Sequence, residues 1–330
     1  MSSKTNFDRN RFRYFYKQMC RIRHFEKTAI KAKTENLVLG AIHPSIGQEA
    51  AAVGVCENLN RNDILLSTHR GHGHTLSKGA SANSMMLELL GRNGGSCAGK
   101  GGSMHIADFN VGMLGANGVV GANINIGVGA AHAIKLKGEN RIVVCIFGDG
   151  AINRGPFLEG LNWAKIYNLP ILFICEDNMY AATTKTVKTT AGKGVIARAQ
   201  SLGLEAQSLN GNDILEVDHV AQVFIAKTRQ QGPMLLHLRT YRLSGHTSTD
   251  QATYRPSEET KMKWLEDPIA ICADLLRNRG VPQNELTKID KDAFIEMAEV
   301  YQAAKLAQFP SPARAYEDVQ DIGDPRVDCF

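Results

Sequence analysis

Two polar motifs, each directly after an apolar run, combine side chains that can hold a metal ion. Gly148-Asp149-Gly150 follows the run 142–147, and Asn178 follows soon after the run 171–175. Such runs predict buried parallel strands, and open parallel sheets bind ligands at the carboxyl ends of their strands. The Asp149 carboxylate and the Asn178 amide oxygen, with phosphate oxygens and water, would suit an octahedral Mg²⁺ site. Although a lone Gly-Asp-Gly indicates only a tight turn, the two motifs together predict a metal–phosphate site.

The elements that would position these residues alternate along the chain. Apolar runs at 63–67, 142–147, 171–175 and 234–238 predict strands, and helical patterns lie at 81–91, 156–168, 216–230 and 285–308. This alternation indicates an α/β fold, a parallel sheet with helices on both faces. The basic N-terminal stretch has apolar residues at helical spacing, so we expect a folded amphipathic helix there rather than a transit peptide. These apolar residues are Phe12, Phe15, Met19, Ile22 and Phe25.

Composition excludes several classes of protein. The 330 residues are 43% hydrophobic and 22% charged, which is typical of a globular protein with a sizeable core. The net charge of +5 does not by itself indicate a nucleic-acid partner, and the apolar runs are too short to cross a membrane. The seven cysteines have no spacing typical of a zinc site, and their odd number favours a reducing compartment, the cytoplasm.

The order of the motifs resembles that of one enzyme family. Besides Gly148-Asp149-Gly150 and Asn178, the motifs are Gly-Lys-Gly-Gly-Ser-Met-His at 99–105, Gly-Ala-Asn-Gly-Val-Val-Gly at 115–121, and Thr-Tyr-Arg followed by Gly-His within 240–246. Together they resemble the α subunit of the E1 component of thiamine diphosphate-dependent 2-oxo acid dehydrogenase complexes, including the related acetoin dehydrogenase. The resemblance runs from about Phe15 to about Phe309. It implies one thiamine diphosphate-binding domain over 1–330, with an N-terminal helix at about 10–35 and a C-terminal helical extension at about 255–330.

The resemblance also implies roles for the residues at matching positions. Mg²⁺ would be held by Asp149, Asn178 and the backbone carbonyl of Tyr180. His43 should face the substrate, and His43 and His246 are the expected catalytic proton carriers. His69 stands where the family usually has a tyrosine, which leaves its role open. The expected cofactor-binding residues are His69, Arg70, Gly118, Val120, Asp149, Gly150, Ala151, Asn178, Tyr180, Arg242 and His246.

The resemblance further implies partners and a reaction. Thiamine diphosphate needs a glutamate beside its pyrimidine ring, which a second domain supplies in single-chain relatives. A length of 330 residues leaves little space for such a domain in this chain. An E1 β subunit is therefore expected, in an α₂β₂ heterotetramer that docks on a lipoyl-bearing E2 acyltransferase. The expected substrates are acetoin, slightly favoured, or pyruvate. Branched-chain 2-oxo acids and another thiamine-dependent aldehyde transfer stay open, as does phosphorylation of Thr247 in the polar loop 244–254.

Three other segments suggest different ligands. Residues 94–101 approach a P-loop, which would make the chain a non-catalytic nucleotide-binding module, but Gly101 replaces the required Ser/Thr and no clear strand precedes it. His69, His72 and His74 could suggest zinc, but their spacing matches no zinc motif. Gly127-Val128-Gly129 lacks the third glycine of a dinucleotide fingerprint and has no expected strand before it. We expect these glycines to allow close helix packing beneath the site.

Overall fold

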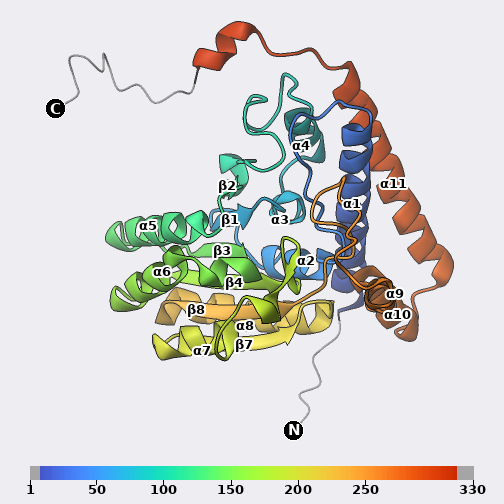
Figure 1. The fold of residues 1–330 in the computed structure, drawn as a ribbon. Helices are drawn as coiled ribbons and strands as arrows, with labels where there is room; N and C mark the ends of the chain where they lie inside the picture. Colours follow the sequence, from blue (N-terminus) through green and yellow to red (C-terminus); the bar gives the residue numbers. More distant parts are fainter. Residues whose placement is uncertain (1–7, 318–330) are drawn as a thin grey trace.

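The computed structural model describes residues 8–317, and its centre is a six-stranded sheet in which every neighbouring pair is parallel. The strand order is β2-β1-β3-β4-β8-β7. The predicted α/β class is therefore confirmed (Figure 1). The strands are β1 (Ile64–Thr68), β2 (Met113–Asn117), β3 (Val143–Gly148), β4 (Ile171–Asp177), β7 (Glu205–Asn210) and β8 (Met234–Arg239), and a separate small hairpin consists of β5 (Tyr180–Ala181) and β6 (Thr184–Lys185).

Helices cover both faces of the sheet. One face packs against α5 (Ala122–Leu136), α6 (Gly155–Ile166) and α7 (Gly194–Ser201). The other packs against α2 (Glu49–Cys56) and α8 (Ile214–Gln231), and beyond α2 the helices α1 (Arg9–Thr34) and α11 (Gln283–Leu306) lie side by side (Figure 1). The remaining helices are α3 (His72–Ser77), α4 (Ala82–Leu89), α9 (Ser257–Trp264) and α10 (Pro268–Asn278), with short 3₁₀ turns η1 (Phe109–Val111), η2 (Asp149–Asn153), η3 (Thr186–Lys188) and η4 (Pro312–Tyr316).

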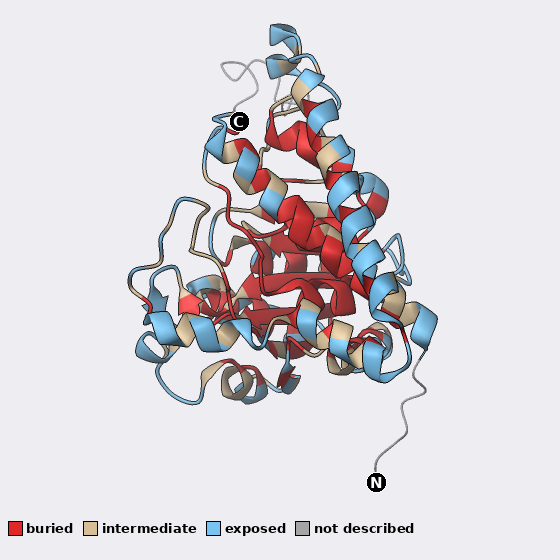
Figure 2. Ribbon diagram, turned by 90° about the vertical axis from the view of Figure 1, so that its right-hand side faces the viewer, coloured by how far each residue is buried: buried red, intermediate tan, exposed pale blue. Residues whose placement is uncertain are grey.

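The central strands are buried on both faces because their side chains alternate between two apolar clusters. In β3, Val143, Cys145 and Phe147 join the cluster under α5 and α6, whereas Val144 and Ile146 join the cluster under α2 and α8. The period of two residues is the geometry of any strand, and here both faces need apolar cover. Figure 2 shows the buried residues gathered in the middle of the molecule, with exposed stripes on the outer helices.

The elements expected from the sequence are present, with ends that differ by a few residues. All five apolar residues of the N-terminal pattern are buried in α1. The sequence did not predict β2 and β7, which are the two edge strands. The expectation that no strand precedes Gly127 is therefore wrong, since β2 comes directly before α5.

The C-terminal part contains α9, α10, α11 and η4. The portions 1–7 and 318–330 of the expected domain lie outside the described residues. Within residues 8–317, no helix is both long and apolar enough to cross a membrane.

The topology marks one place as the natural ligand site. The chain passes from β1 outward to β2, and then returns to the other side of β1 to form β3 and β4. The strand order thus reverses between β1 and β3. In open parallel sheets, the crevice at the carboxyl ends of the strands beside such a reversal is where ligands bind.

Candidate active site at the reversal of strand order

A cavity of about 410 Å³ opens at the carboxyl ends of β1, β3 and β4. Its size is within the range of small-molecule and cofactor sites. All residues expected from the sequence line it, although they come from segments far apart in the chain. They are His43, His69, Arg70, Gly118, Val120, Asp149, Gly150, Ala151, Asn178, Tyr180, Arg242 and His246. The structure thus brings the predicted set together, while the role of each residue stays a prediction.

Asp149 lies at the end of β3, where its carboxylate is almost fully buried. Its Oδ2 accepts a hydrogen bond from the Thr186 hydroxyl. Burial raises the pKa of Asp149 to about 6, although the Thr186 hydrogen bond opposes the shift. A buried carboxylate with a raised pKa gains from a nearby cation, because positive charge favours the ionised form.

Asn178 follows β4, and a second side chain holds its amide. Its Nδ2 donates to Gln48 Oε1 at 3.3 Å, and Gln48 Nε2 donates to Glu176 Oε2 at 2.9 Å. Asn178 Oδ1 accepts a hydrogen bond from the Tyr180 backbone N–H at 3.3 Å. Since an amide oxygen has two lone pairs, Oδ1 can still ligate a metal ion.

The donor set at this edge fits Mg²⁺ rather than a transition metal. It consists of one carboxylate, one amide oxygen and the backbone carbonyl of Tyr180, all hard oxygen donors. Nowhere in the described part of the chain do three or more His, Cys, Asp or Glu side chains form a group able to hold a metal ion. Mg²⁺ commonly binds through one or two carboxylates and completes its shell with phosphate oxygens and water. The residues present therefore fit a Mg²⁺–diphosphate pair.

Two buried arginines give the cavity an excess of positive charge. Arg70 Nη1 donates to the Pro44 carbonyl at 3.0 Å, and Arg70 Nη2 donates to the His246 carbonyl at 2.9 Å. Burial, followed by the charge of Arg242, lowers the pKa of Arg70 to about 9. The Nε of Arg242 is buried and has no hydrogen-bond partner within the described residues. Among residues 8–317 neither arginine forms an ion pair with a carboxylate, and two such cations close together form a natural site for a phosphate anion.

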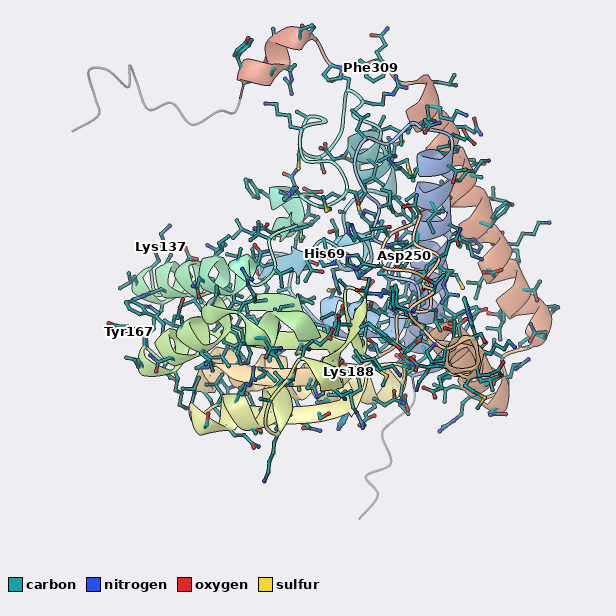
Figure 3. All side chains as sticks on the ribbon, viewed as in Figure 1. His69, Lys137, Tyr167, Lys188, Asp250 and Phe309 are labelled. Carbon is teal, nitrogen blue, oxygen red and sulfur yellow. The ribbon has the colours of Figure 1, made fainter. Side chains whose placement is uncertain are left out.

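Three histidine rings meet beside these arginines. The ring of His43 lies 4.7 Å from that of His69 and 5.0 Å from that of His246, measured between centroids. His246 Nδ1 lies 2.9 Å from Arg70 Nη2, a permanent donor, so Nδ1 accepts and the ring proton is on Nε2. Figure 3 shows His69 between the sheet and the loop that carries Asp250.

Burial, followed by the nearby charge of Arg70, keeps these imidazoles neutral. The pKa falls to about 3 for His43, about 2 for His69 and about 4 for His246. His43 Nδ1 is buried without a hydrogen-bond partner in the described structure. Neutral rings can donate a hydrogen bond or accept a proton, and a bound anion would raise their pKa values. A neutral His69 ring can thus donate a hydrogen bond to a ligand from the position where the family usually has a tyrosine.

The zinc alternative fails because His72 and His74 are engaged elsewhere. His72 lies 2.9 Å from Glu26 Oε2 and 3.0 Å from Ser103 Oγ, one partner for each ring nitrogen. His74 likewise bonds Ser67 Oγ at 2.8 Å and Glu176 Oε1 at 2.9 Å. With both nitrogens of each ring occupied, these two histidines are not free to ligate zinc.

The P-loop alternative fails because a carboxylate of the chain itself fills the loop. Glu88 accepts hydrogen bonds of 2.7–3.0 Å from four backbone N–H groups, those of Cys97, Gly99, Gly101 and Gly102. These donors are of the kind that would bind a nucleotide phosphate. The helix α4, not a strand, precedes the loop. The structure therefore gives no support to a nucleotide-binding module.

Sequence reasoning missed several residues of the site. Gln48, Glu176 and Arg154 line the cavity, and Thr186 bonds Asp149. Gln48 could have been found from the sequence, since Gln48-Glu49 is a polar pair in an otherwise small and apolar stretch at the start of α2. No sequence signal marked Thr186, because its position depends on how the chain after β4 folds back.

Comparison with known proteins agrees with the motifs. Residues 17–313 match the sequence model of the dehydrogenase E1 component family. The chain is 38% identical to the alpha subunit of acetoin:2,6-dichlorophenolindophenol oxidoreductase from Cupriavidus necator, covering 92% of each chain. It is 41% identical to the protein of the same name from Bacillus subtilis, covering 78% of each. It is 36% identical to the pyruvate dehydrogenase E1 component subunit alpha of Zymomonas mobilis, covering 94% of this chain and 89% of the relative.

Both observations, the family match over most of the chain and relatives of this identity over most of their length, agree with the resemblance drawn from the motifs. The chain therefore belongs to the dehydrogenase E1 component family and is an oxidoreductase of the alpha-subunit type.

Proposed function

We propose that this chain is the α subunit of a thiamine diphosphate- and Mg²⁺-dependent E1 enzyme. It would cleave acetoin or decarboxylate pyruvate, and transfer the acyl unit to the lipoyl group of an E2 partner. The observation that carries the proposal is one cavity lined both by Asp149 and Asn178, which can supply hard oxygen donors, and by two buried arginines, Arg70 and Arg242. That combination suits a metal-bound diphosphate, and the E1 family implies thiamine diphosphate as the cofactor.

The cavity residues would share the binding of the cofactor. Asp149, Asn178 and the Tyr180 carbonyl would hold Mg²⁺, while Arg70 and Arg242 would neutralise the phosphates, with His69 and His246 beside them. Backbone groups of Gly150 and Ala151 would lie near the diphosphate, and those of Gly118 and Val120 near the aminopyrimidine ring. When bound, thiamine diphosphate supplies the nucleophilic carbon for attack on a carbonyl substrate.

His43 and His246 are the proposed proton carriers. His43 lines the cavity as a neutral ring, and a neutral imidazole can donate to or accept from a bound substrate. His246 is held by Arg70 with its proton on Nε2. With Nδ1 occupied by Arg70, the neutral His246 ring can donate a hydrogen bond through its Nε2–H, and it would take up and release a proton once a bound anion drew Arg70 away from Nδ1.

A β subunit completes the proposed site. The acidic residues lining the cavity in the described structure are Asp149 and Glu176, and Glu176 already bonds His74 and Gln48. Neither is free to serve as the glutamate beside the pyrimidine ring, so a partner chain must supply it. We propose an α₂β₂ heterotetramer in the cytoplasm that docks on a lipoyl-bearing E2, with each α chain acting as one cofactor-binding domain.

The proposal is tested by dye reduction with the chain co-expressed with a β-type partner. Thiamine diphosphate and Mg²⁺ are supplied, and acetoin, pyruvate and branched-chain 2-oxo acids are compared. We expect turnover of acetoin or pyruvate only when both chains and both cofactors are present. Preference for a branched-chain 2-oxo acid would move the substrate to the alternative class. Cofactor binding with no turnover of any of these substrates would contradict the proposed reaction.

A further inference from the structure

The segment 41–48 forms part of the cavity wall without belonging to a helix or strand. It carries His43 at one end and Gln48 at the other, and both line the cavity. Regular ladder hydrogen bonds do not hold such a segment, so its shape depends on individual contacts. Ser45, midway between the two cavity residues, is almost fully buried and makes such a contact.

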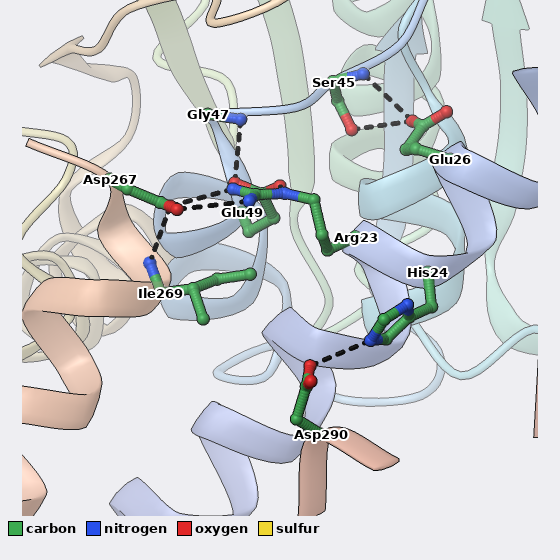
Figure 4. Close-up of polar contacts among 9 residues, drawn as sticks. All are labelled: Arg23, His24, Glu26, Ser45, Gly47, Glu49, Asp267, Ile269 and Asp290. Carbon is green, nitrogen blue, oxygen red and sulfur yellow. Dashed lines mark hydrogen bonds and ion pairs between the residues drawn. The ribbon is translucent and has the colours of Figure 1, made fainter. Parts of the chain in front are cut away.

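Glu26 of α1 binds Ser45 from behind the wall. One oxygen of this fully buried carboxylate, Oε1, accepts from the Ser45 N–H at 3.0 Å and from the Ser45 hydroxyl at 2.8 Å (Figure 4). These contacts fix both the backbone and the side chain of Ser45. A charge-assisted hydrogen bond is about twice as strong as a neutral one.

The other oxygen of Glu26 reaches a second wall segment. Oε2 lies 2.9 Å from Nδ1 of His72, and Nε2 of His72 lies 3.0 Å from the Ser103 hydroxyl. Ser103 directly precedes Met104, which lines the cavity. Burial alone would raise the pKa of Glu26, but His72 and the Ser45 donors together lower it, so Glu26 stays ionised. One buried carboxylate therefore links two separate parts of the wall.

We propose that Glu26 is a positioning residue of the active site. Through Ser45 and His72 it holds the segments that carry His43 and Met104 in the geometry that turnover requires. The expected loss of turnover rests on the proposed E1 function, whereas the structural role of Glu26 in holding the two segments does not. Glu26 itself does not line the cavity, so it acts only through the residues it holds.

The same helix offers a matched control. His24, two residues before Glu26, bonds Asp290 of α11 at 2.8 Å, away from the wall segments (Figure 4). Asp290→Asn weakens this contact of α1 without touching Ser45 or His72. Glu26→Gln keeps the size of the side chain but removes its charge, and Ser45→Ala removes one hydrogen bond while leaving the Ser45 N–H bond in place.

The experiment measures kcat, KM and thermal midpoint of the assembled enzyme with its β partner and saturating cofactors. We expect Glu26→Gln to lower kcat per cofactor-loaded site by roughly 10- to 100-fold, because small misplacements of catalytic groups cost about that much. Ser45→Ala should have a smaller effect in the same direction, and Asp290→Asn none. A wild-type kcat in both Glu26→Gln and Ser45→Ala, with only the thermal midpoint lowered, would overturn the proposal.

Hydrogen exchange provides a readout that does not depend on activity. Faster exchange of the amides in 41–48 and 103–105 in Glu26→Gln, but not in Asp290→Asn, is the expected result. If wild-type enzyme reduced no dye with any substrate, the proposed function would fail, yet the exchange comparison would still decide the role of Glu26. Unchanged exchange in both segments would reject it. Should Glu26→Gln not fold, Ser45→Ala carries the same comparison for 41–48.

Discussion

Burial alters the protonation of single residues both in the cavity and away from it, and Glu57 is an example outside the cavity. The Tyr14 hydroxyl of α1 donates to its carboxylate at 3.2 Å, just after the end of α2. Burial raises the pKa of Glu57 from its ordinary 4.5 to about 7, although Tyr14 and two arginines oppose the shift. The ionised form of the Glu57 carboxylate is thus less stable here than in water.

This shift predicts a pH dependence of stability. Because the folded-state pKa is raised, the contribution of Glu57 to stability is complete below about pH 4.5 and is lost as pH rises through 7. Glu57→Gln cannot ionise, so its free energy of unfolding relative to that of wild type should increase as the pH rises from 5 to 8. Since water reaches the site, the gain should stay below about 1 kcal/mol. Urea unfolding at both pH values measures it, and Glu258→Gln on the exposed face of α9 is the control. If the free energies of unfolding of Glu57→Gln and wild type differed by the same amount at pH 5 and pH 8, the raised pKa of Glu57 would be refuted.

At the scale of elements, helix α5 packs closely on the sheet directly behind the cavity. A Cβ added to Gly127 would lie 3.0 Å from Leu66 and 3.3 Å from both Cys145 and Ile171. Two residues on, a Cβ added to Gly129 would meet nothing within 4 Å. The expected role of these glycines in close helix packing is thus confirmed for Gly127 only.

The pair gives a prediction with its own control. Gly127→Ala should destabilise the protein by about 1–3 kcal/mol, because the methyl group pushes α5 away from β1 and β3. Gly129→Ala should instead stabilise it by about 0.5–1 kcal/mol, since alanine favours an exposed helix position. Chemical denaturation of both variants measures the difference. Equal effects would show that α5 does not pack as described.

How well the sequence predicts an element or a contact depends on whether a local residue pattern or the folding of the chain determines it. Strands β3 and β4 were predictable because they are buried on both faces, and Asp149 and Asn178 were predictable because they follow those strands. The edge strand β7, Glu205–Asn210, is largely polar and exposed on both sides of its chain, so its pattern gave no signal. The Glu26–His72 contact joins segments far apart in sequence, and the Glu88 contacts depend on how the glycine-rich loop after α4 folds back, so only the fold reveals them.

At the scale of the whole molecule, the C-terminal helices support the cavity indirectly. Arg23 of α1 lies between Glu49, at 2.5 Å, and Asp267, at 2.8 Å (Figure 4). Glu49 in turn accepts from the Gly47 N–H of the cavity wall at 2.9 Å, and Asp267 caps α10. α1 thus connects the C-terminal helices to the segment that carries His43. Removing one member of such a buried ion pair costs about 3–5 kcal/mol, so these contacts hold the wall segment and the start of α10 together.

The central claim is that Asp149 and its neighbours bind a Mg²⁺–diphosphate group. Its most direct test is calorimetric titration of thiamine diphosphate into the chain assembled with its β partner, with Mg²⁺ and with a chelator. Asp149→Ala is compared with wild type, and Asp274→Ala on the exposed face of α10 serves as the control. We predict binding that requires Mg²⁺ in wild type and Asp274→Ala, and no measurable Mg²⁺-dependent binding in Asp149→Ala. Equal affinity with and without Mg²⁺, or wild-type affinity in Asp149→Ala, would contradict the claim.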